Sequence, residues 1–231
     1  MPSYEDLWYA AKLTEIVYMP SKILETFGES RVKYLILSED MENPSKICLR
    51  SGVVLAERPR IITPQYFIQQ NIQNFNADAR KYFSEVLSGK QRALFVQYGL
   101  NFRKEAYTEE FVMGQIQEIA HQAAGDAQDN LQEMRGVIIA PDDGWEISLM
   151  KFITELVQKS APYHMQQLSR HGDLTLVGGV PKSVHNEIEK DFTVCNSLNK
   201  AKELGAKLRD YGIFENYEDR FYELFRRLKK A

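Results

Sequence analysis

Residues 136–146 read Gly-Val-Ile-Ile-Ala-Pro-Asp-Asp-Gly-Trp-Glu, and this stretch sets the architecture expected for the chain. The apolar run Gly136–Ala140 is typical of a central strand, because a strand covered on both faces carries apolar side chains on both. Pro141 and the Asp-Asp-Gly that follows it are turn chemistry. Beyond them, apolar residues between Ile147 and Val157 recur at helical spacing. The stretch therefore predicts a strand, a loop and a helix, in that order.

The segment before this stretch predicts the other strands of a sheet. Residues 31–37 have a strand-like alternation, and a turn over residues 41–45 leads into a second strand over residues 46–49. Ser51-Gly52 interrupts the pattern and residues 53–55 resume it, so we expect two antiparallel hairpins in succession.

Two more elements are expected between the hairpins and the central strand. Residues 93–102 predict a further strand. Thr108 is expected to cap a long helix that runs to about Asn130, with Phe111, Val112 and Ile116 on its apolar face.

The resulting fold class is α+β: a small, mostly antiparallel sheet packed with helices, followed by a helical C-terminal region. Three helices are expected in that region, over residues 181–192, 197–210 and 217–228. The sheet-containing domain would cover residues 1–160 and the helical region residues 161–231, with the two packed as one globular unit.

Composition and charge argue against several classes of protein. A chain of 231 residues can bury a core without disulfides. A net charge of −3 with no basic stripe does not favour nucleic-acid binding, and no apolar run is long enough to predict a membrane span. Cys48 and Cys195 lie far apart and neither has a CxxC partner, so we expect no disulfide framework, no cysteine-only zinc site and a cytoplasmic location.

Asp142, Asp143 and Glu146 are the candidate catalytic residues. In α/β sheets, ligands bind beyond the carboxyl ends of strands, and two carboxylates there could hold Mg²⁺ or supply a general base. This interpretation describes a metal-assisted hydrolase or phosphoryl-transfer enzyme, and only then is Mg²⁺ expected; otherwise we expect no cofactor and no metal. The structural alternative is a capping box, because Asp143 and Glu146 have the spacing of an N-cap residue and the third residue of a helix.

A glycine turn before a predicted helix is a candidate anion site. Gly178, Gly179 and Lys182 combine a flexible loop, a helix N-terminus and a positive charge, which together attract anions. The sequence is not a phosphate-binding loop, and Pro181 removes one N–H donor. A Gly-Gly turn with proline at the first helical position explains the same residues without a ligand.

Aromatic-rich helices near both ends of the chain suggest a partner surface. One apolar stripe in the last predicted helix, together with Trp8 in the first, makes up the predicted interaction residues: Trp8, Tyr217, Phe221, Leu224, Phe225 and Leu228. Such a stripe packs either in the protein's own core or in a groove of another chain. Because the usual catalytic motifs are missing, the first functional prediction is a non-catalytic cytoplasmic interaction or assembly protein that acts through these helices, on a protein partner or as a homo-oligomer. Whether the protein is an enzyme stays open.

Overall fold

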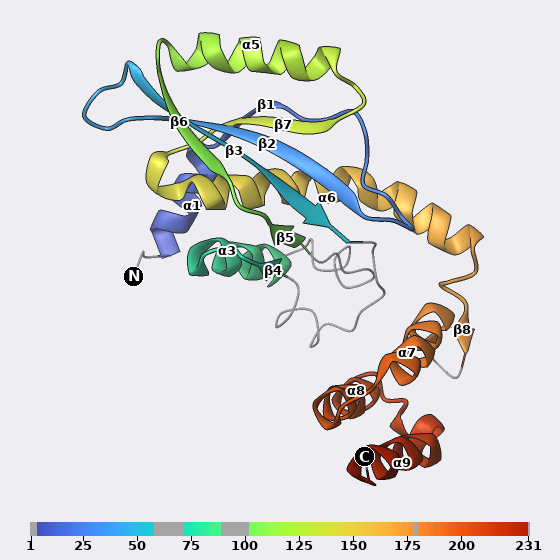
Figure 1. Ribbon diagram of the computed structural model, residues 1–231. Helices are drawn as coiled ribbons and strands as arrows, with labels where there is room; N and C mark the ends of the chain where they lie inside the picture. The colour runs from blue at the N-terminus through green and yellow to red at the C-terminus, as the bar shows by residue number, and fades with distance from the viewer. Residues whose placement is uncertain (1–3, 58–71, 89–101, 178–179, 231) are drawn as a thin grey trace.

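The computed structural model describes residues 4–57, 72–88, 102–177 and 180–230, and its architecture is α+β, as predicted (Figure 1). Most of the strand predicted over residues 93–102 lies outside the described residues. None of the helices in the described part of the chain has the length and apolar character that a bilayer crossing requires.

One mixed sheet forms the centre of the molecule. Its strands lie in the order β1 (Glu15–Tyr18), β7 (Met134–Ile139), β2 (Ser30–Glu39), β3 (Lys46–Ala56), β5 (Phe102–Lys104) and β4 (Ile72–Gln73), and β6 (Thr108–Met113) pairs with the first part of β3. Among the described strands only the β2–β7 and β4–β5 pairs are parallel, so the prediction of a mostly antiparallel sheet is confirmed.

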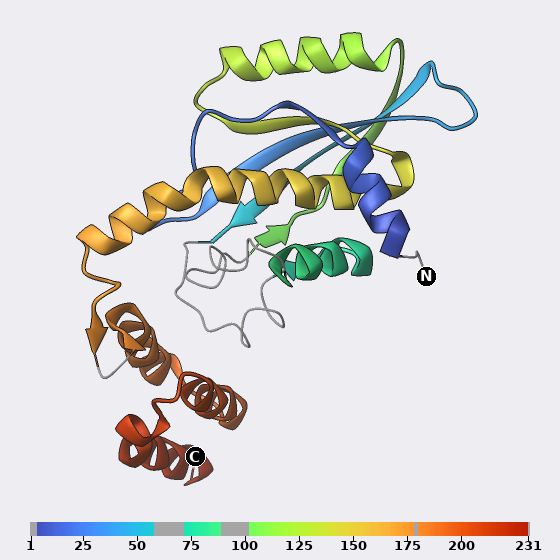
Figure 2. The ribbon, with the colours of Figure 1, turned by 180° about the vertical axis from the view of Figure 1, so that it is seen from behind.

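Helices cover both faces of this sheet. Helix α5 (Ile116–Asp129) lies on one face, and helices α1 (Tyr4–Leu13), α3 (Ala77–Ser88) and α6 (Trp145–Arg170) lie on the other (Figures 1 and 2). The larger core lies between the sheet and α6, where the Phe152 ring rests against Gly136 of β7. The predicted strand, loop and helix at residues 136–146 are therefore present, and they place the start of α6 next to the carboxyl end of β7.

Strands β2 and β3 form one long hairpin, so the prediction of two successive hairpins is wrong. Tyr34 lies directly across from Gly52, and a Cβ atom at residue 52 would lie 2.5 Å from the Tyr34 hydroxyl oxygen. Gly52 therefore makes room for a tyrosine of the neighbouring strand, and β3 continues through it without a turn.

The long helix predicted from Thr108 is also wrong, because residues 108–113 form strand β6 and α5 begins only at Ile116. Val112 and Ile116 are four residues apart, which mimics helical spacing. Both pack against the core between α5 and the sheet, but Val112 comes from β6 and Ile116 from the first turn of α5, with Gly114 between them. The Gly114 N–H donates to the Ser45 carbonyl, which extends the pairing of β6 with β3 to the turn.

The C-terminal region contains the three predicted helices. A short hairpin of β8 (Leu176–Val177) and β9 (Val180–Pro181) precedes α7 (Lys182–Val194), α8 (Leu198–Asp210) and α9 (Phe214–Lys230). These helices share a core of their own and lie together beyond the C-terminal end of α6 (Figures 1 and 2). Helix α6 itself runs without a break across the boundary predicted after residue 160.

Candidate functional site

A cluster of charged side chains lies where the start of α6 meets strands β3, β5 and β6. We call it the charged corner, and it consists of Arg50, Lys104, Glu109, Asp142 and Glu146. Asp142 belongs to the 3-10 turn η1 (Asp142–Gly144), which connects the carboxyl end of β7 to α6. Two of the three candidate catalytic residues predicted from the sequence therefore lie in this cluster.

Arg50 is only 7% exposed and is held by acceptors on three elements. Its Nη2 donates to Asp142 Oδ1 at 2.6 Å, its Nε to Glu109 Oε2 at 2.8 Å, and its Nη1 to Ser38 Oγ at 3.3 Å. Burial acts to lower the pKa of Arg50, but the hydrogen bonds to Asp142 and Glu109 and the charge of Asp142 act together against it, and the pKa is raised. The guanidinium is therefore a fixed positive charge that links β2, β3, β6 and η1.

Glu146 connects the start of α6 to two other elements, β5 and α3. It forms a buried ion pair with Lys104 of β5, and its Oε2 accepts a hydrogen bond from the Asn76 N–H at 2.6 Å. The Asn76 side chain in turn accepts from the Ala79 N–H at 2.8 Å in the first turn of α3. The predicted capping box is therefore wrong: Gly144 is the N-cap of α6, it provides no side-chain cap, and Glu146 turns away to the sheet and α3.

Aromatic rings cover the two buried cations. Lys104 Nζ lies 4.6 Å from the centre of the Trp145 ring, and Arg50 Cζ lies 5.6 Å from it. Tyr107 packs on Trp145 with 4.9 Å between ring centres. These cation–π contacts add to the ion pairs in stabilising charges that are withdrawn from water.

Tyr34 lies beneath this aromatic layer with its hydroxyl buried. That hydroxyl has no hydrogen-bond partner among the described residues. Burial raises the pKa of Tyr34, and the charge of Glu146 raises it further. The side chain is therefore a neutral phenol at the base of the charged corner.

The acids of the 142–146 turn do not converge on a common ligand. Asp142 faces Arg50, Asp143 is exposed, and Glu146 faces Lys104. Within the described ranges, no group of three or more histidine, cysteine, aspartate or glutamate side chains could hold a metal ion. Two of the three predicted carboxylates, Asp142 and Glu146, are thus paired with Arg50 and Lys104, which local sequence patterns did not single out.

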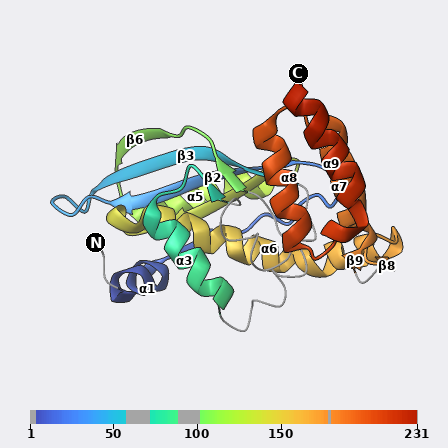
Figure 3. The same cartoon turned by 90° about the horizontal axis from the view of Figure 1, so that it is seen from below.

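Strand β6 forms an outer edge of the sheet beside the charged corner, and Figure 3 shows it lying outside β3. It pairs with β3 on one side, and no described strand pairs with its other side. Glu109, Phe111 and Met113 lie on the same face of the sheet as their partners Arg50, Cys48 and Lys46. Phe111 is 54% exposed and Met113 is 68% exposed, so no described helix covers this face of the sheet at β6, whereas Val112 packs under α5 on the other face. We call these three residues the β6 edge.

The backbone of the β6 edge points outward. The Lys46 carbonyl accepts from Asp40 in the β2–β3 turn, whereas the Ser45 carbonyl accepts from the Gly114 N–H. Because backbone groups alternate sides along a strand, the even-numbered residues of β6 face β3. The N–H and C=O groups of Glu109, Phe111 and Met113 therefore face away from the sheet.

The predicted interaction residues are used inside the protein. Phe221 and Leu224 are buried in the core of the α7–α9 region, and Tyr217, Phe225 and Leu228 are partly buried against it. Trp8 packs edge-on against Tyr82 of α3, with 5.6 Å between ring centres. The apolar stripe of α9 therefore has a destination within this chain.

The predicted anion site is described only in part. Gly178 and Gly179 lie outside the described residues, and Lys182 is exposed at the start of α7. The first N–H groups of α7 are already used, since Lys182 donates to the Thr175 carbonyl at 2.8 Å and Ser183 to the Asp173 carbonyl at 3.3 Å.

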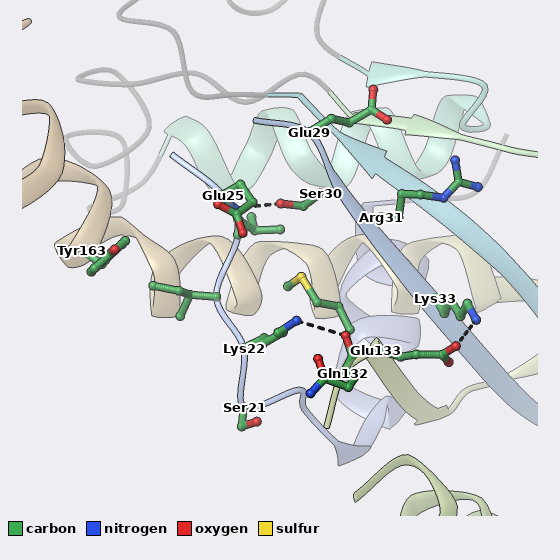
Figure 4. A pocket seen from close by; sticks show the side chains of 13 residues that line it. Ser21, Lys22, Glu25, Glu29, Ser30, Arg31, Lys33, Gln132, Glu133 and Tyr163 are labelled. Atoms are coloured by element: carbon green, nitrogen blue, oxygen red, sulfur yellow. Dashed lines mark hydrogen bonds and ion pairs between the residues drawn. The ribbon is translucent and has the colours of Figure 1, made fainter. Parts of the chain in front are cut away.

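A separate pocket of about 740 Å³ lies at the opposite end of β2 and β7 (Figure 4). Acids and bases alternate around it, and several already bind one another. Lys33 pairs with Glu133 at 2.5 Å, and Lys22 donates to the Gln132 carbonyl at 3.0 Å. Its rim therefore presents no single charge to a ligand.

No known protein family, curated protein or solved structure matches this chain. Function has to be inferred from the geometry of the sites themselves.

Sequence reasoning missed Arg50, Lys104 and the β6 edge. For Arg50 a signal was present, because it is a charged residue inside an otherwise apolar strand pattern; β6 was hidden by its helix-like spacing to α5.

Proposed function

We propose that the protein is a non-catalytic interaction module that binds an extended, positively charged segment of a partner protein along the β6 edge. The observation that carries this proposal is the row of outward-facing backbone groups at Glu109, Phe111 and Met113. The side chains of Phe111 and Met113 are also exposed. An open strand edge of this kind is a template for strand addition, in which the backbone supplies affinity and alternate side chains supply specificity.

The charges around the edge favour a basic segment. Glu109 and Glu110 lie on β6 itself, and Asp142 and Asp143 lie on the neighbouring turn. Arg50 is the buried counter-charge of two of these acids. The surroundings of the edge therefore carry an excess of negative charge, which attracts and orients a partner with lysine or arginine.

The contacts of the charged corner support a structural role for the acids. The enzyme alternative requires Asp142 and Asp143 to share a metal ion or substrate, whereas Asp142 binds Arg50 and Asp143 points into solvent. The partner is placed on β6 and not on the terminal helices, because the α9 stripe packs within its own bundle.

A reducing compartment such as the cytoplasm suits this function. Cys48 and Cys195 are both free and buried. Cys48 lies directly across from Phe111, and burial raises the pKa of its thiol, which keeps it in the unreactive protonated form.

The test uses a fluorescent, end-blocked peptide in which threonine alternates with valine, phenylalanine and lysine, titrated against the full chain by fluorescence anisotropy. We expect Phe111→Ala to weaken binding about fivefold through loss of a cross-strand pair. Phe111→Pro should weaken it about tenfold more, because it also removes an outward N–H that no described strand uses.

Tyr222→Ala is the matched control, since Tyr222 is an exposed aromatic of α9. It should leave the affinity unchanged, and unfolding curves should show that all three variants are folded. Equal binding to Phe111→Pro and the unaltered protein, or loss of binding in Tyr222→Ala alone, would overturn the proposal.

A further inference from the structure

We infer that the β6 edge selects its partner by a period-two pattern: a lysine or arginine opposite Glu109, and apolar residues opposite Phe111 and Met113. This inference rests on the proposed function and adds the sequence that the partner must carry. It follows from which side chains of β6 are exposed, and from which of its backbone groups lack a hydrogen-bond partner among the described residues.

The first step is register. In a strand added to β6, the residues directly opposite Glu109, Phe111 and Met113 project from the same face as these side chains. The residues between them project from the other face. Only every second residue of the partner therefore meets the β6 edge, and a shift by one residue removes all three contacts.

The second step is the residue opposite Glu109. The Glu109 side chain is 38% exposed, and Arg50 Nε binds only one of its oxygens in the described structure. Asp142, which is also bound to Arg50, is 39% exposed and lies on the same side of the sheet. Two half-exposed carboxylates that share one buried cation leave negative charge at the surface, so this position selects a cation.

The third step is the pair of residues opposite Phe111 and Met113. Lys46 of β3 is the residue directly opposite Met113, and its Nζ is 4.3 Å from the centre of the Phe111 ring. Lys46 is already paired with Asp40 at 3.1 Å, so a second cation at this end would meet the Lys46 ammonium and find no unpaired carboxylate beside it among the described residues. The exposed ring and thioether gain instead by removing apolar surface from water. These positions therefore select apolar residues.

The pattern depends on the direction of the partner strand. An antiparallel partner carries, from its N-terminus, apolar-x-apolar-x-basic, and a parallel partner carries basic-x-apolar-x-apolar. In both cases the cation and the residue facing Met113 are four positions apart. That spacing is the part of the inference that an experiment can measure directly.

The experiment is a disulfide scan in the full chain. Met113→Cys places a thiol on an exposed residue of β6, while both native cysteines are buried. Cysteine is moved one residue at a time through the unlabelled test peptide, on both sides of its lysine, and the crosslinked fraction is measured at equilibrium in a glutathione buffer. Disulfide geometry requires close Cα atoms, so the yield reports the register.

We expect the yield to peak at a peptide cysteine four residues from the lysine, and to fall at least severalfold at three and five residues. Replacing the peptide lysine by norleucine should weaken binding about two- to fivefold, and the effect should shrink in Glu109→Gln, which keeps an acceptor for Arg50. A crosslinking peak at an odd spacing from the lysine, or a flat yield profile, overturns the period-two pattern. Strand addition itself would still be supported if binding remained sensitive to Phe111→Pro. If the peptide does not bind, both proposals fail together, and that outcome is recognised by the anisotropy titration alone.

Discussion

Arg50 and Asp142 lie 92 residues apart in the sequence and meet through a 2.6 Å hydrogen bond between Nη2 and Oδ1. This contact fastens the turn after β7 to the middle of β3. It also explains why the acids of residues 142–146, which look catalytic in the sequence, face cations of the sheet instead of a shared ligand. The charged corner therefore stabilises the junction of α6 with the sheet and sets the charge beside the β6 edge.

The Lys104–Glu146 pair should be the most sensitive part of this junction. Both side chains are at least 90% buried, so Lys104→Met leaves a carboxylate buried without its cation. We expect the free energy of unfolding in urea to fall by about 3 kcal/mol. The double variant Lys104→Met/Glu146→Leu should recover only part of this loss, because no buried charge remains but the Asn76 N–H loses the Glu146 carboxylate that accepts from it. Asp143→Asn, at an exposed acid of the same turn, should change stability by less than about 0.5 kcal/mol; a Lys104→Met loss no larger than that would contradict the assignment.

Removing the Tyr34 hydroxyl should not destabilise the protein. The group is buried with no hydrogen-bond partner among the described residues, so Tyr34→Phe removes a desolvated polar group and keeps the ring. Urea unfolding should give a stability equal to that of the unaltered protein or up to about 1 kcal/mol higher. A loss of more than about 1 kcal/mol would reveal a bound partner, such as an ordered water, at this hydroxyl.

Two glycines provide a matched test of the packing of α6 on the sheet. A Cβ atom at Gly136 would lie 2.3 Å from the Phe152 ring, whereas a Cβ at Gly125 of α5 would meet nothing within 4 Å. Gly136→Ala should therefore cost about 1–3 kcal/mol through overpacking. Gly125→Ala should raise stability by up to about 1 kcal/mol, because alanine favours the helix. Thermal or urea unfolding of the two variants should move in opposite directions, and a shared direction would contradict this packing.

His164 should make the fold sensitive to mild acid. The ring is fully buried on α6, its Nε2 lies 2.7 Å from the Leu24 carbonyl oxygen, and burial lowers its pKa. Because the folded pKa lies below the unfolded value of about 6.5, the stability linked to His164 is fully present above that pH. It is lost as pH falls from about 6.5 towards the folded pKa.

Urea unfolding at pH 7.5 and 5.5 measures this loss. His164→Gln should lose less stability over this interval than the unaltered protein does. His121→Gln, at an exposed histidine of α5, should lose as much as the unaltered protein. Identical pH dependence in all three proteins would rule out a buried neutral His164.

The sequence could predict elements whose pattern is local. Gly136–Ala140 is apolar on both faces, and the strand it predicts is β7, which lies inside the sheet between β1 and β2. The three C-terminal helices follow from helical spacing, and Ser197, where the second of them is expected to begin, accepts a hydrogen bond from the Lys200 N–H as the N-cap of α8. By contrast, Gly52 looks like a turn until Tyr34 is placed across from it, and β6 looks helical until its register with β3 is known.

The candidate site depends on contacts that are distant in sequence, and these could not be predicted. Asp142 and Glu146 could be found as a motif, but their partners Arg50 and Lys104 come from other strands. Phe111 is exposed because no described helix or strand packs over its side chain. Which elements pack over a residue is decided by the tertiary fold, and the local sequence around Phe111 does not predict it. The interpretation of Asp142 and Glu146 therefore changes from catalytic to structural, because each is paired with a cation of the sheet.

Amide hydrogen exchange of β6, followed residue by residue by NMR, tests the account most directly. In the free protein the Glu110 and Val112 amides should be protected by β3, while those of Glu109, Phe111 and Met113 should exchange quickly. Saturation with the lysine-containing peptide should protect these three amides. Binding that leaves them unprotected, or that protects residues of α9 instead, would contradict strand addition at β6.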